Sequence, residues 1–209
     1  METIELIGSG GHCKSCVDVI EASNQYRMLG VVVPKNFPVR QQNPEQYPIL
    51  GTDDDLKIIV SQTKNILIAI GQLGKGELRA SLFQSALDAG AVFPTIVSMF
   101  AYTSNRSSIG EGTIIMHMAV VNSGAIIGAN CIINSMALVE HDVVIGNNVH
   151  VATGALINGN VTIGSNCFVG SGATIKQGVT IGKNTVIQAG QFVRDSLPEN
   201  TVFGIHDEQ

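Results

Sequence analysis

The sequence predicts a two-part chain: a small Rossmann-like α/β domain over residues 1–95, followed by a left-handed parallel β-helix over residues 96–209. Two observations carry this prediction. An Ile or Val recurs every six residues from Ile109 to Val193, fifteen times in register. Before that repeat, apolar runs alternate with helical patterns, which is typical of a parallel sheet covered by helices.

The six-residue repeat excludes an α-helix, because a 3.6-residue period would spread these side chains around the whole helix surface. A second, longer repeat accompanies it: the dipeptide Ile-Gly recurs every eighteen residues, at Gly110, Gly128, Gly146, Gly164 and Gly182. Three hexads therefore make one coil, and we expect five coils stacked as a triangular prism. The Ile and Val column points inward, and glycines or asparagines take positive φ at the corners.

The first part of the chain reads as strands and helices in alternation. We expect strands over 3–7, 28–33 and 65–70, a helix after the first glycine turn, a second helix over 76–89, and a surface loop over 34–48. The first strand runs into Gly8-Ser9-Gly10-Gly11-His12, and the third ends at Gly71. The result is a small parallel sheet.

Composition limits the classes of function. Charged residues are 14% of the 209, Gly numbers 23 and the formal net charge is -5, so the chain is not of the disordered class. No basic cluster suits nucleic acid or anionic lipid, and no apolar run is long enough to span a membrane. We therefore expect small-molecule partners, no nucleic acid, no membrane, and a cytoplasmic protein whose four cysteines are free thiols.

The glycine turn allows two interpretations that the sequence leaves open: a phosphate site at a helix N-terminus, or a tight turn and nothing more. NAD binding is disfavoured, because Cys13 stands where the dinucleotide fingerprint has its third glycine, and no acidic residue follows Val33. Cys13 and Cys16 form a C-x-x-C pair, for which a redox role is conceivable. We favour packing, and we predict no metal site.

Polar residues interrupt the solenoid at one place. Glu140, His141, Asp142 and His150 each break the repetition once, whereas a purely structural rod would repeat the same polar residues coil after coil. This irregularity locates a candidate site, with His141 as its central residue. His117 shares no column with His141 and is interpreted as an interface or surface residue.

A GSGGH-type loop followed by hexapeptide coils with an E-H-D segment resembles the bacterial sugar O- and N-acetyltransferases, over essentially the whole chain. That family includes sialic acid O-acetyltransferases and N-acetyltransferases of nucleotide-linked 4-amino sugars. The resemblance implies a homotrimer with active sites at subunit interfaces. It also implies that acetyl-CoA lies along the β-helix between neighbouring subunits, and that the α/β domain holds the nucleotide of the sugar.

The resemblance also implies roles for particular residues. His141 corresponds to the catalytic base, with Asp142 raising its basicity, and His150 would contact acetyl-CoA. Asn134 and Gly159 correspond to a polar active-site residue and to a backbone amide that faces the thioester oxygen. The nucleotide-sugar site is assigned to the two strand ends and the glycine loop, in a set of five residues: Gly8, Gly10, Gly11, His12 and Gly71.

The residue types agree with this chemistry. A sugar amine or hydroxyl must lose a proton as it attacks a thioester, and histidine titrates in the right range to accept it. Asp142 can fix the imidazole tautomer, while Glu140 lies on the other side of the strand. Gly159 follows His141 by eighteen residues and so lies one coil above it as an oxyanion donor. We predict direct transfer without an acyl-enzyme.

The preferred function is N-acetylation of a UDP- or dTDP-linked 4-amino-4,6-dideoxy sugar in bacterial surface-glycan biosynthesis. Relatives that hold a uridine nucleotide carry an acidic pair after the second strand, where this chain has Val33-Pro34-Lys35, so the nucleotide stays open. Three alternatives remain: O-acetylation of a sialic-type nonulosonic acid, a γ-type zinc carbonic anhydrase, and a non-catalytic β-helix scaffold.

Overall fold

The computed structural model describes residues 1–36 and 47–204 of the 209-residue chain. Its first part is a four-stranded parallel sheet in the order β3-β2-β1-β4. The elements of this part are β1 (Glu2–Ile7), α1 (Gly11–Ser23), β2 (Tyr26–Val33), β3 (Ile49–Thr52), η2 (Asp53–Asp55), α2 (Leu56–Gln62), β4 (Ile66–Ile68) and α3 (Glu77–Asp88).

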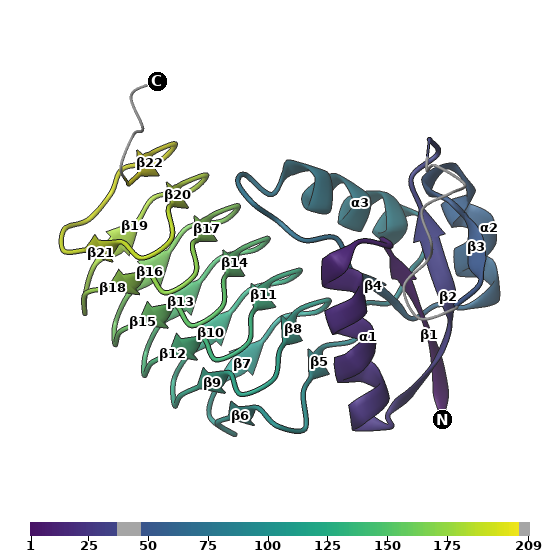
Figure 1. The fold of residues 1–209 in the computed structure, drawn as a ribbon, viewed down its shortest axis with the longest axis horizontal. Helices are drawn as coiled ribbons and strands as arrows, with labels where there is room; N and C mark the ends of the chain where they lie inside the picture. Colours follow the sequence, from purple (N-terminus) through teal and green to yellow (C-terminus); the bar gives the residue numbers. More distant parts are fainter. Residues whose placement is uncertain (37–46, 205–209) are drawn as a thin grey trace.

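Both faces of this sheet are covered. Alternate residues of β1 face opposite sides, so Ile4 and Leu6 pack against α1 while Ile7 packs against α2 and α3. The three-layer arrangement confirms the predicted α/β domain (Figure 1). The sequence reading missed β3, η2 and α2. Most of the loop expected over 34–48, residues 37–46, lies outside the described residues.

The second part is a parallel β-helix whose short strands form three stacked sheets, here called faces 1, 2 and 3 (Figure 1). Face 1 holds β5 (Ile96–Val97), β8 (Ile114–Ile115), β11 (Ile132–Ile133), β14 (His150–Val151), β17 (Phe168–Val169), β20 (Val186–Ile187) and β22 (Val202–Phe203). Face 2 holds β6 (Tyr102–Thr103), β9 (Val120–Val121), β12 (Leu138–Val139), β15 (Leu156–Ile157), β18 (Thr174–Ile175) and β21 (Phe192–Val193). Face 3 holds β7 (Ser108–Ile109), β10 (Ile126–Ile127), β13 (Val144–Ile145), β16 (Thr162–Ile163) and β19 (Thr180–Ile181).

The predicted inward column forms the core of this left-handed solenoid. Residues from Ile115 to Val193 that belong to the column are at most 2% exposed, and Ile109 packs against them from the open end. Strands pair with a register of eighteen residues, for example Leu138 with Leu156. At the corners, Asn and Gly take positive φ as expected, and Asp142 is among the few other residues that do so.

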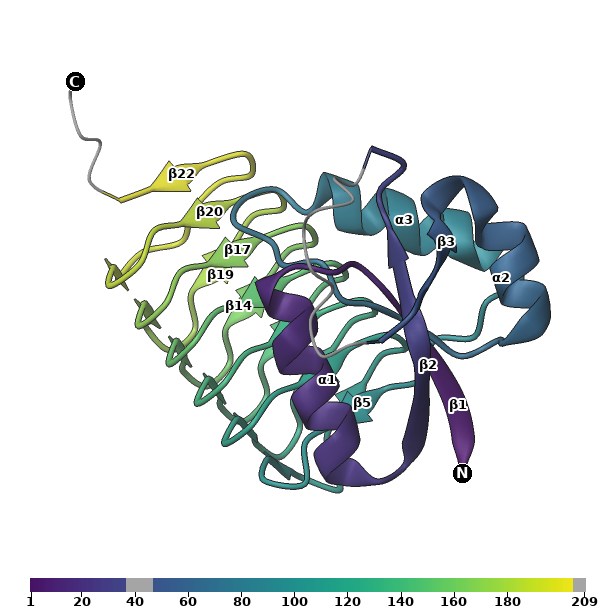
Figure 2. The same cartoon turned by 45° about the vertical axis from the view of Figure 1, so that its right-hand side comes forward.

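The α/β domain is fixed to face 1 of the solenoid. Helix α1 lies along this face next to β5 (Figure 2), and Ile96, Ile114 and Ile132 share its apolar core. The buried guanidinium of Arg79 donates to the carbonyl of Ile68 at 2.9 Å and to Asn130 Oδ1 at 2.8 Å, which joins the end of β4 to a solenoid corner. These contacts set the position of the sheet's carboxyl end against the coils.

A second link joins the two parts at His117, which the sequence reading placed at an interface or on the surface. Its Nε2 lies 2.8 Å from Asp18 Oδ2 on α1, and its Nδ1 lies 2.6 Å from the hydroxyl oxygen of the buried Ser98. His117 therefore connects helix and solenoid and takes no part in the His141 column.

Glu5 makes the stability of the α/β domain depend on pH. Burial raises the pKa of this carboxyl to about 7, and its Oε2 has no hydrogen-bond partner among the described residues. Because the folded-state pKa lies above the unfolded value, Glu5 stabilises the fold below pH 4.5, and this contribution is lost as the pH rises through 7.

Glu5→Gln should therefore unfold at higher urea concentration than the wild type at pH 8, with little difference at pH 4.5. Urea titrations followed by circular dichroism at the two pH values measure this. The exposed Glu111→Gln is the matched control and should shift neither midpoint. A Glu5→Gln protein that loses stability equally at both pH values would contradict the prediction.

Candidate active site

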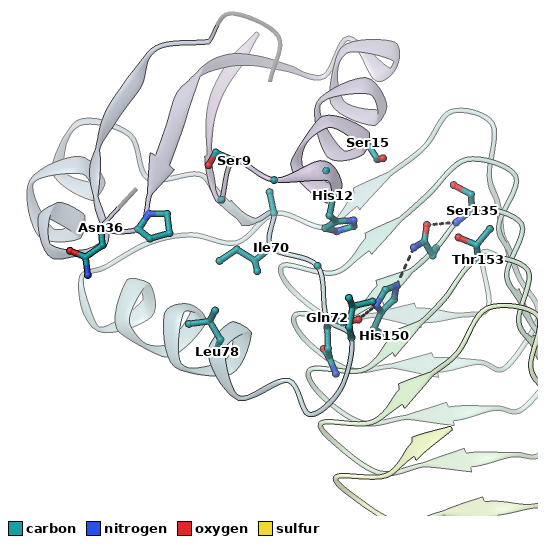
Figure 3. A pocket seen from close by; sticks show the side chains of 18 residues that line it. Ser9, His12, Ser15, Asn36, Ile70, Gln72, Leu78, Ser135, His150 and Thr153 are labelled. Atoms are coloured by element: carbon teal, nitrogen blue, oxygen red, sulfur yellow. Dashed lines mark hydrogen bonds between the residues drawn. The ribbon is translucent and has the colours of Figure 1, made fainter. Parts of the chain in front are cut away.

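A cavity of about 920 Å³ lies between the carboxyl end of the sheet and the corner joining faces 1 and 2 (Figure 3). The α/β domain contributes the glycine turn and His12, and the solenoid contributes His150, Ser135 and Thr153. Seven residues predicted to bind substrate or cofactor line this one cavity: Gly8, Gly10, Gly11, His12, Gly71, Asn134 and His150. The structure thus brings together residues up to 142 positions apart in the chain, from Gly8 to His150.

The glycine turn shapes one wall. Gly8 has φ +126°, and a Cβ there would come within 3.0 Å of the Ala69 backbone, so only glycine fits. Gly10 precedes α1 without a side-chain cap, which leaves N–H groups of the first helical turn available to a ligand. Helix N-termini bind phosphate well, and the carboxyl ends of parallel strands are where open α/β sheets bind ligands.

His150 is held from both ring nitrogens. Its Nδ1 lies 2.8 Å from the carbonyl oxygen of Gln72, which can only accept, so Nδ1 carries the proton. Its Nε2 then accepts from the Asn134 amide at 3.1 Å. Burial lowers the pKa of His150 to about 4. The ring is therefore a neutral, oriented wall of the cavity, and Gln72, which fixes it, is a residue that sequence reasoning missed.

His12 is neutral for the same reason. Burial, with a smaller contribution from the charge of Arg79, lowers its pKa to about 3, and its Nε2 lies 3.4 Å from Cys16 Sγ. Burial also raises the pKa of the Cys13 thiol to about 12, which leaves that thiol protonated and unreactive near neutral pH. The cysteines of the C-x-x-C pair are both buried free thiols, in agreement with the packing interpretation.

His141 lies elsewhere, at the corner between faces 2 and 3. Its Nδ1 is 2.9 Å from Asp142 Oδ2, and its side chain is 51% exposed. A Cβ built on Gly159 would lie 2.6 Å from the imidazole Nε2, so the ring lies directly against this glycine of the next coil. The Gly159 N–H donates no hydrogen bond within the described part of the chain.

Asp142 owes its position to the corner geometry. It has φ +59°, while Gly124, Asn160 and Gly178 occupy the equivalent corner of other coils with similar φ. Aspartate tolerates this left-handed conformation, though less readily than glycine. A Cβ on Gly124 would meet Asp142 Oδ1 at 2.4 Å, so the carboxylate needs the bare glycine below it. Gly124 was missed, although its eighteen-residue offset from Asp142 was a usable signal.

The neighbouring carboxylate has another task. Glu140 Oε2 accepts from the His141 backbone N–H at 3.1 Å and so caps the turn, leaving the ring to Asp142.

Within the single chain, the cavity lining contains neither His141 nor Gly159. The predicted site residues therefore form two groups: the cavity group around His150 and the pair His141–Asp142 with Gly159.

Three segments of the chain match models of known protein families. Residues 3–85 match the PglD N-terminal domain, residues 106–141 match the bacterial transferase hexapeptide (six repeats), and residues 160–194 match the hexapeptide repeat of succinyl-transferase. No curated protein sequence resembles the chain closely enough to count as a match.

Solved structures share the complete architecture. The acetyltransferase domain of PglB from Neisseria gonorrhoeae FA1090 is 28% identical with a TM-score of 0.87, over 98% of this chain and 97% of that one. A histidine-to-asparagine variant of perosamine N-acetyltransferase from Caulobacter crescentus, in complex with CoA and GDP-perosamine, is 28% identical with a TM-score of 0.89, over 98% and 94%. The chain resembles the hexapeptide-repeat sugar acetyltransferases over almost its whole length. WeeI from Acinetobacter baumannii AYE is also similar, at 25% identity and a TM-score of 0.83, over 98% and 97%.

Two further findings concern metal ions and membranes. No three His, Cys, Asp or Glu side chains gather into a possible metal site in the portion of the chain that the structure describes. In the same portion, none of the helices has the length and apolar character needed to cross a bilayer.

The cavity histidines should stay neutral throughout the physiological pH range. Nitrogen-15 NMR of labelled histidine should show His150 as the Nδ1–H tautomer with a pKa near 4, and His12 with a pKa near 3, because burial disfavours their charged forms. His12→Asn and His150→Asn variants assign the signals. A His150 titration near its ordinary value of 6.5 would contradict the buried, hydrogen-bonded ring.

Proposed function

We propose that the chain N-acetylates a nucleotide-linked 4-amino-4,6-dideoxy sugar in bacterial surface-glycan biosynthesis, with acetyl-CoA as donor and His141 as general base. The observation that carries the proposal is the His141–Asp142 pair lying against Gly159. It combines a base, a group that orients the base and a backbone donor within two adjacent coils. The solved acetyltransferase domain of PglB in complex with acetyl coenzyme A supports the choice of donor.

The base acts through Nε2. Asp142 Oδ2 accepts a hydrogen bond from the His141 Nδ1–H, with 2.9 Å between nitrogen and oxygen, which leaves the Nε2 lone pair for the substrate. The sugar amine attacks the thioester carbonyl carbon and passes a proton to Nε2. Asp142 then stabilises the imidazolium, which returns the proton to the departing CoA thiolate as the carbon–sulfur bond breaks.

Gly159 supplies the other half of the chemistry. Gly159 lies against the imidazole, and its N–H donates no hydrogen bond among the described residues. This N–H is the proposed donor to the negative oxygen of the tetrahedral intermediate. The buried thiols of Cys13 and Cys16 are protonated and are not available as nucleophiles. Transfer is therefore direct, in a ternary complex without an acyl-enzyme.

The cavity takes the nucleotide-sugar. Its glycine turn and open helix N-terminus suit the diphosphate, and its two histidines present neutral rings to the ligand. UDP or dTDP is our proposed nucleotide, although perosamine N-acetyltransferase is solved with GDP-perosamine. The panel of acceptor substrates to be assayed therefore includes UDP-, dTDP- and GDP-linked amino sugars, and sialic-type acids for the O-acetyl alternative.

We place the reaction in the cytoplasm, in keeping with the free thiols.

A homotrimer with shared sites reconciles the two groups of site residues. His141 lies at the corner of faces 2 and 3, whereas the cavity opens at the corner of faces 1 and 2. Face 2 and the corner that joins it to face 1 expose a row of apolar side chains suited to contact with a second copy of the chain. These are Tyr102 (59% exposed), Met118 (63%), Met136 (61%) and Leu156 (40%). Around a threefold axis, one chain's His141 then reaches its neighbour's cavity.

His141→Asn should lower kcat by roughly 10²–10⁴-fold with little change in the KM of acetyl-CoA, because it removes the proton acceptor and keeps a polar side chain. Release of CoA thiol in the presence of each acceptor of the panel measures this. His117→Gln is the control histidine and should keep the wild-type kcat. Full activity in His141→Asn would remove the base from the mechanism, and no thiol release with any acceptor would exclude the sugar acetyltransferase activity.

Mixed trimers test the shared site. Gly11→Phe should block the cavity without disturbing the fold, since a Cβ there meets no atom within 4 Å. Co-expression of Gly11→Phe with His141→Ala should restore activity to about a quarter of the wild type, because that share of sites pairs an intact cavity with an intact neighbouring histidine. If the mixture stays as inactive as either variant alone, His141 and the cavity work within one chain.

A further inference from the structure

We propose that Arg79 is the positive charge that draws the diphosphate of the acceptor substrate into the cavity, and that it acts from behind the cavity wall. The inference rests on the proposed use of a nucleotide-sugar and adds the residue that balances the substrate's negative charge. Arg79 does not itself line the cavity, so it is a positioning residue that acts through space and not by contact.

The lining of the cavity lacks a charged side chain. None of the described residues that form it is Lys, Arg, Asp or Glu. Burial lowers the pKa of His12 to about 3 and that of His150 to about 4, so both rings are neutral near pH 7. A diphosphate that leaves water for such a cavity loses hydration, and this costs free energy unless a positive charge lies nearby.

Arg79 is a buried cation without a counter-ion. It lies in the first turn of α3, is 2% exposed, and takes part in none of the ion pairs of the described residues. Its guanidinium donates only to neutral oxygens, namely the carbonyls of Ile68, Ile70 and Asn130 and the side-chain amide of Asn130. These bonds solvate the charge but do not cancel it. The first turn of a helix is also the end where the macrodipole disfavours a cation.

Two neighbours place this charge beside the cavity. Ile70, whose carbonyl accepts from Arg79 Nη1, lines the cavity (Figure 3). His12 also lines it, and the charge of Arg79 contributes, after burial, to the low pKa of the His12 ring. A charge that opposes a proton on His12 favours an anion at the same place. The glycine turn that precedes His12 is where the proposed diphosphate lies.

A purely mechanical role for Arg79 would use the same hydrogen bonds, because the side chain also joins β4 to the solenoid. The two roles separate at Asn130, whose Oδ1 accepts from Arg79 Nη2 at 2.8 Å. Asn130→Asp leaves Arg79 in place and keeps an acceptor for it, but the new carboxylate neutralises the guanidinium. Asn130 has φ +52°, a conformation that aspartate also tolerates.

Calorimetric titration of UDP, dTDP and GDP into the full-length protein tests the charge. Asn130→Asp should bind the diphosphate that the wild type prefers roughly ten- to a hundredfold more weakly, which is the effect of one unit charge acting across a layer of backbone. The pKa of His12, measured by nitrogen-15 NMR, should rise in the same variant, because Arg79 no longer opposes its protonation. A merely mechanical role predicts neither change.

Asn184→Asp is the matched control. Asn130, Asn148, Asn166 and Asn184 form one ladder of side-chain amides along a corner of the solenoid, with nitrogen–oxygen distances of 2.8, 3.1 and 3.1 Å. The control therefore makes the same substitution in the same ladder, three coils away from Arg79. It should bind the diphosphate within about threefold of the wild type, because the attraction between charges falls with distance.

A second pair of variants decides the question if circular dichroism shows that Asn130→Asp does not fold. Arg79→Lys keeps the charge and loses the planar set of hydrogen bonds, whereas Arg79→Gln loses both. The charge predicts that Arg79→Gln binds the diphosphate at least about tenfold more weakly than Arg79→Lys. A mechanical role predicts equal losses.

Three outcomes would overturn the inference: wild-type affinity in Asn130→Asp, equal loss in Asn130→Asp and Asn184→Asp, or equal losses in the two Arg79 variants. Each of them leaves the acetyltransferase activity standing. A wild-type protein that binds none of the three diphosphates would instead refute the proposed nucleotide-sugar substrate itself.

Discussion

The eighteen-residue register of the parallel coils is the constraint on which the other features of this chain depend. Each strand pairs with the strand eighteen residues on, as Leu138 does with Leu156. A side chain at a corner therefore lies against the residue eighteen positions away. This places the His141 imidazole on Gly159 and the Asp142 carboxylate on Gly124, and in both cases a Cβ on the glycine would collide with the side chain. The repeat thus stabilises the solenoid and also positions the two side chains of the proposed catalytic pair.

The cavity depends on a different interaction, the fixed docking of the α/β domain. Arg79 joins the carboxyl end of β4 to Asn130, and α1 shares an apolar core with face 1. Because of this docking, the carbonyl of Gln72 meets His150, a residue 78 positions further along the chain. The cavity wall is thus formed by two parts of the chain that carry no common sequence pattern.

The sequence was the best guide to those features of the fold and the candidate site that local periodicity controls. The Ile and Val column sets the solenoid, and the break at His141 and Asp142 located the pair that the structure joins at 2.9 Å. The elements β3, η2 and α2 were missed because they are short. The longest of them, α2 (Leu56–Gln62), has seven residues, too few for a clear hydrophobic period. Gln72 was missed for another reason: its contact with His150 depends on tertiary docking and leaves no trace in either local segment.

The surroundings of the two histidines separate their roles. His150 is buried, and both of its ring nitrogens are engaged, one by a carbonyl and one by an amide, so it can neither accept nor release a proton without breaking a buried hydrogen bond. His141 is half exposed and has a single engaged nitrogen, while its Nε2 has no hydrogen-bond partner among the described residues. Burial disfavours the imidazolium form of His150. Of the two histidines, His141 is therefore the one suited to the base that we propose, and the neutral His150 forms part of the cavity wall.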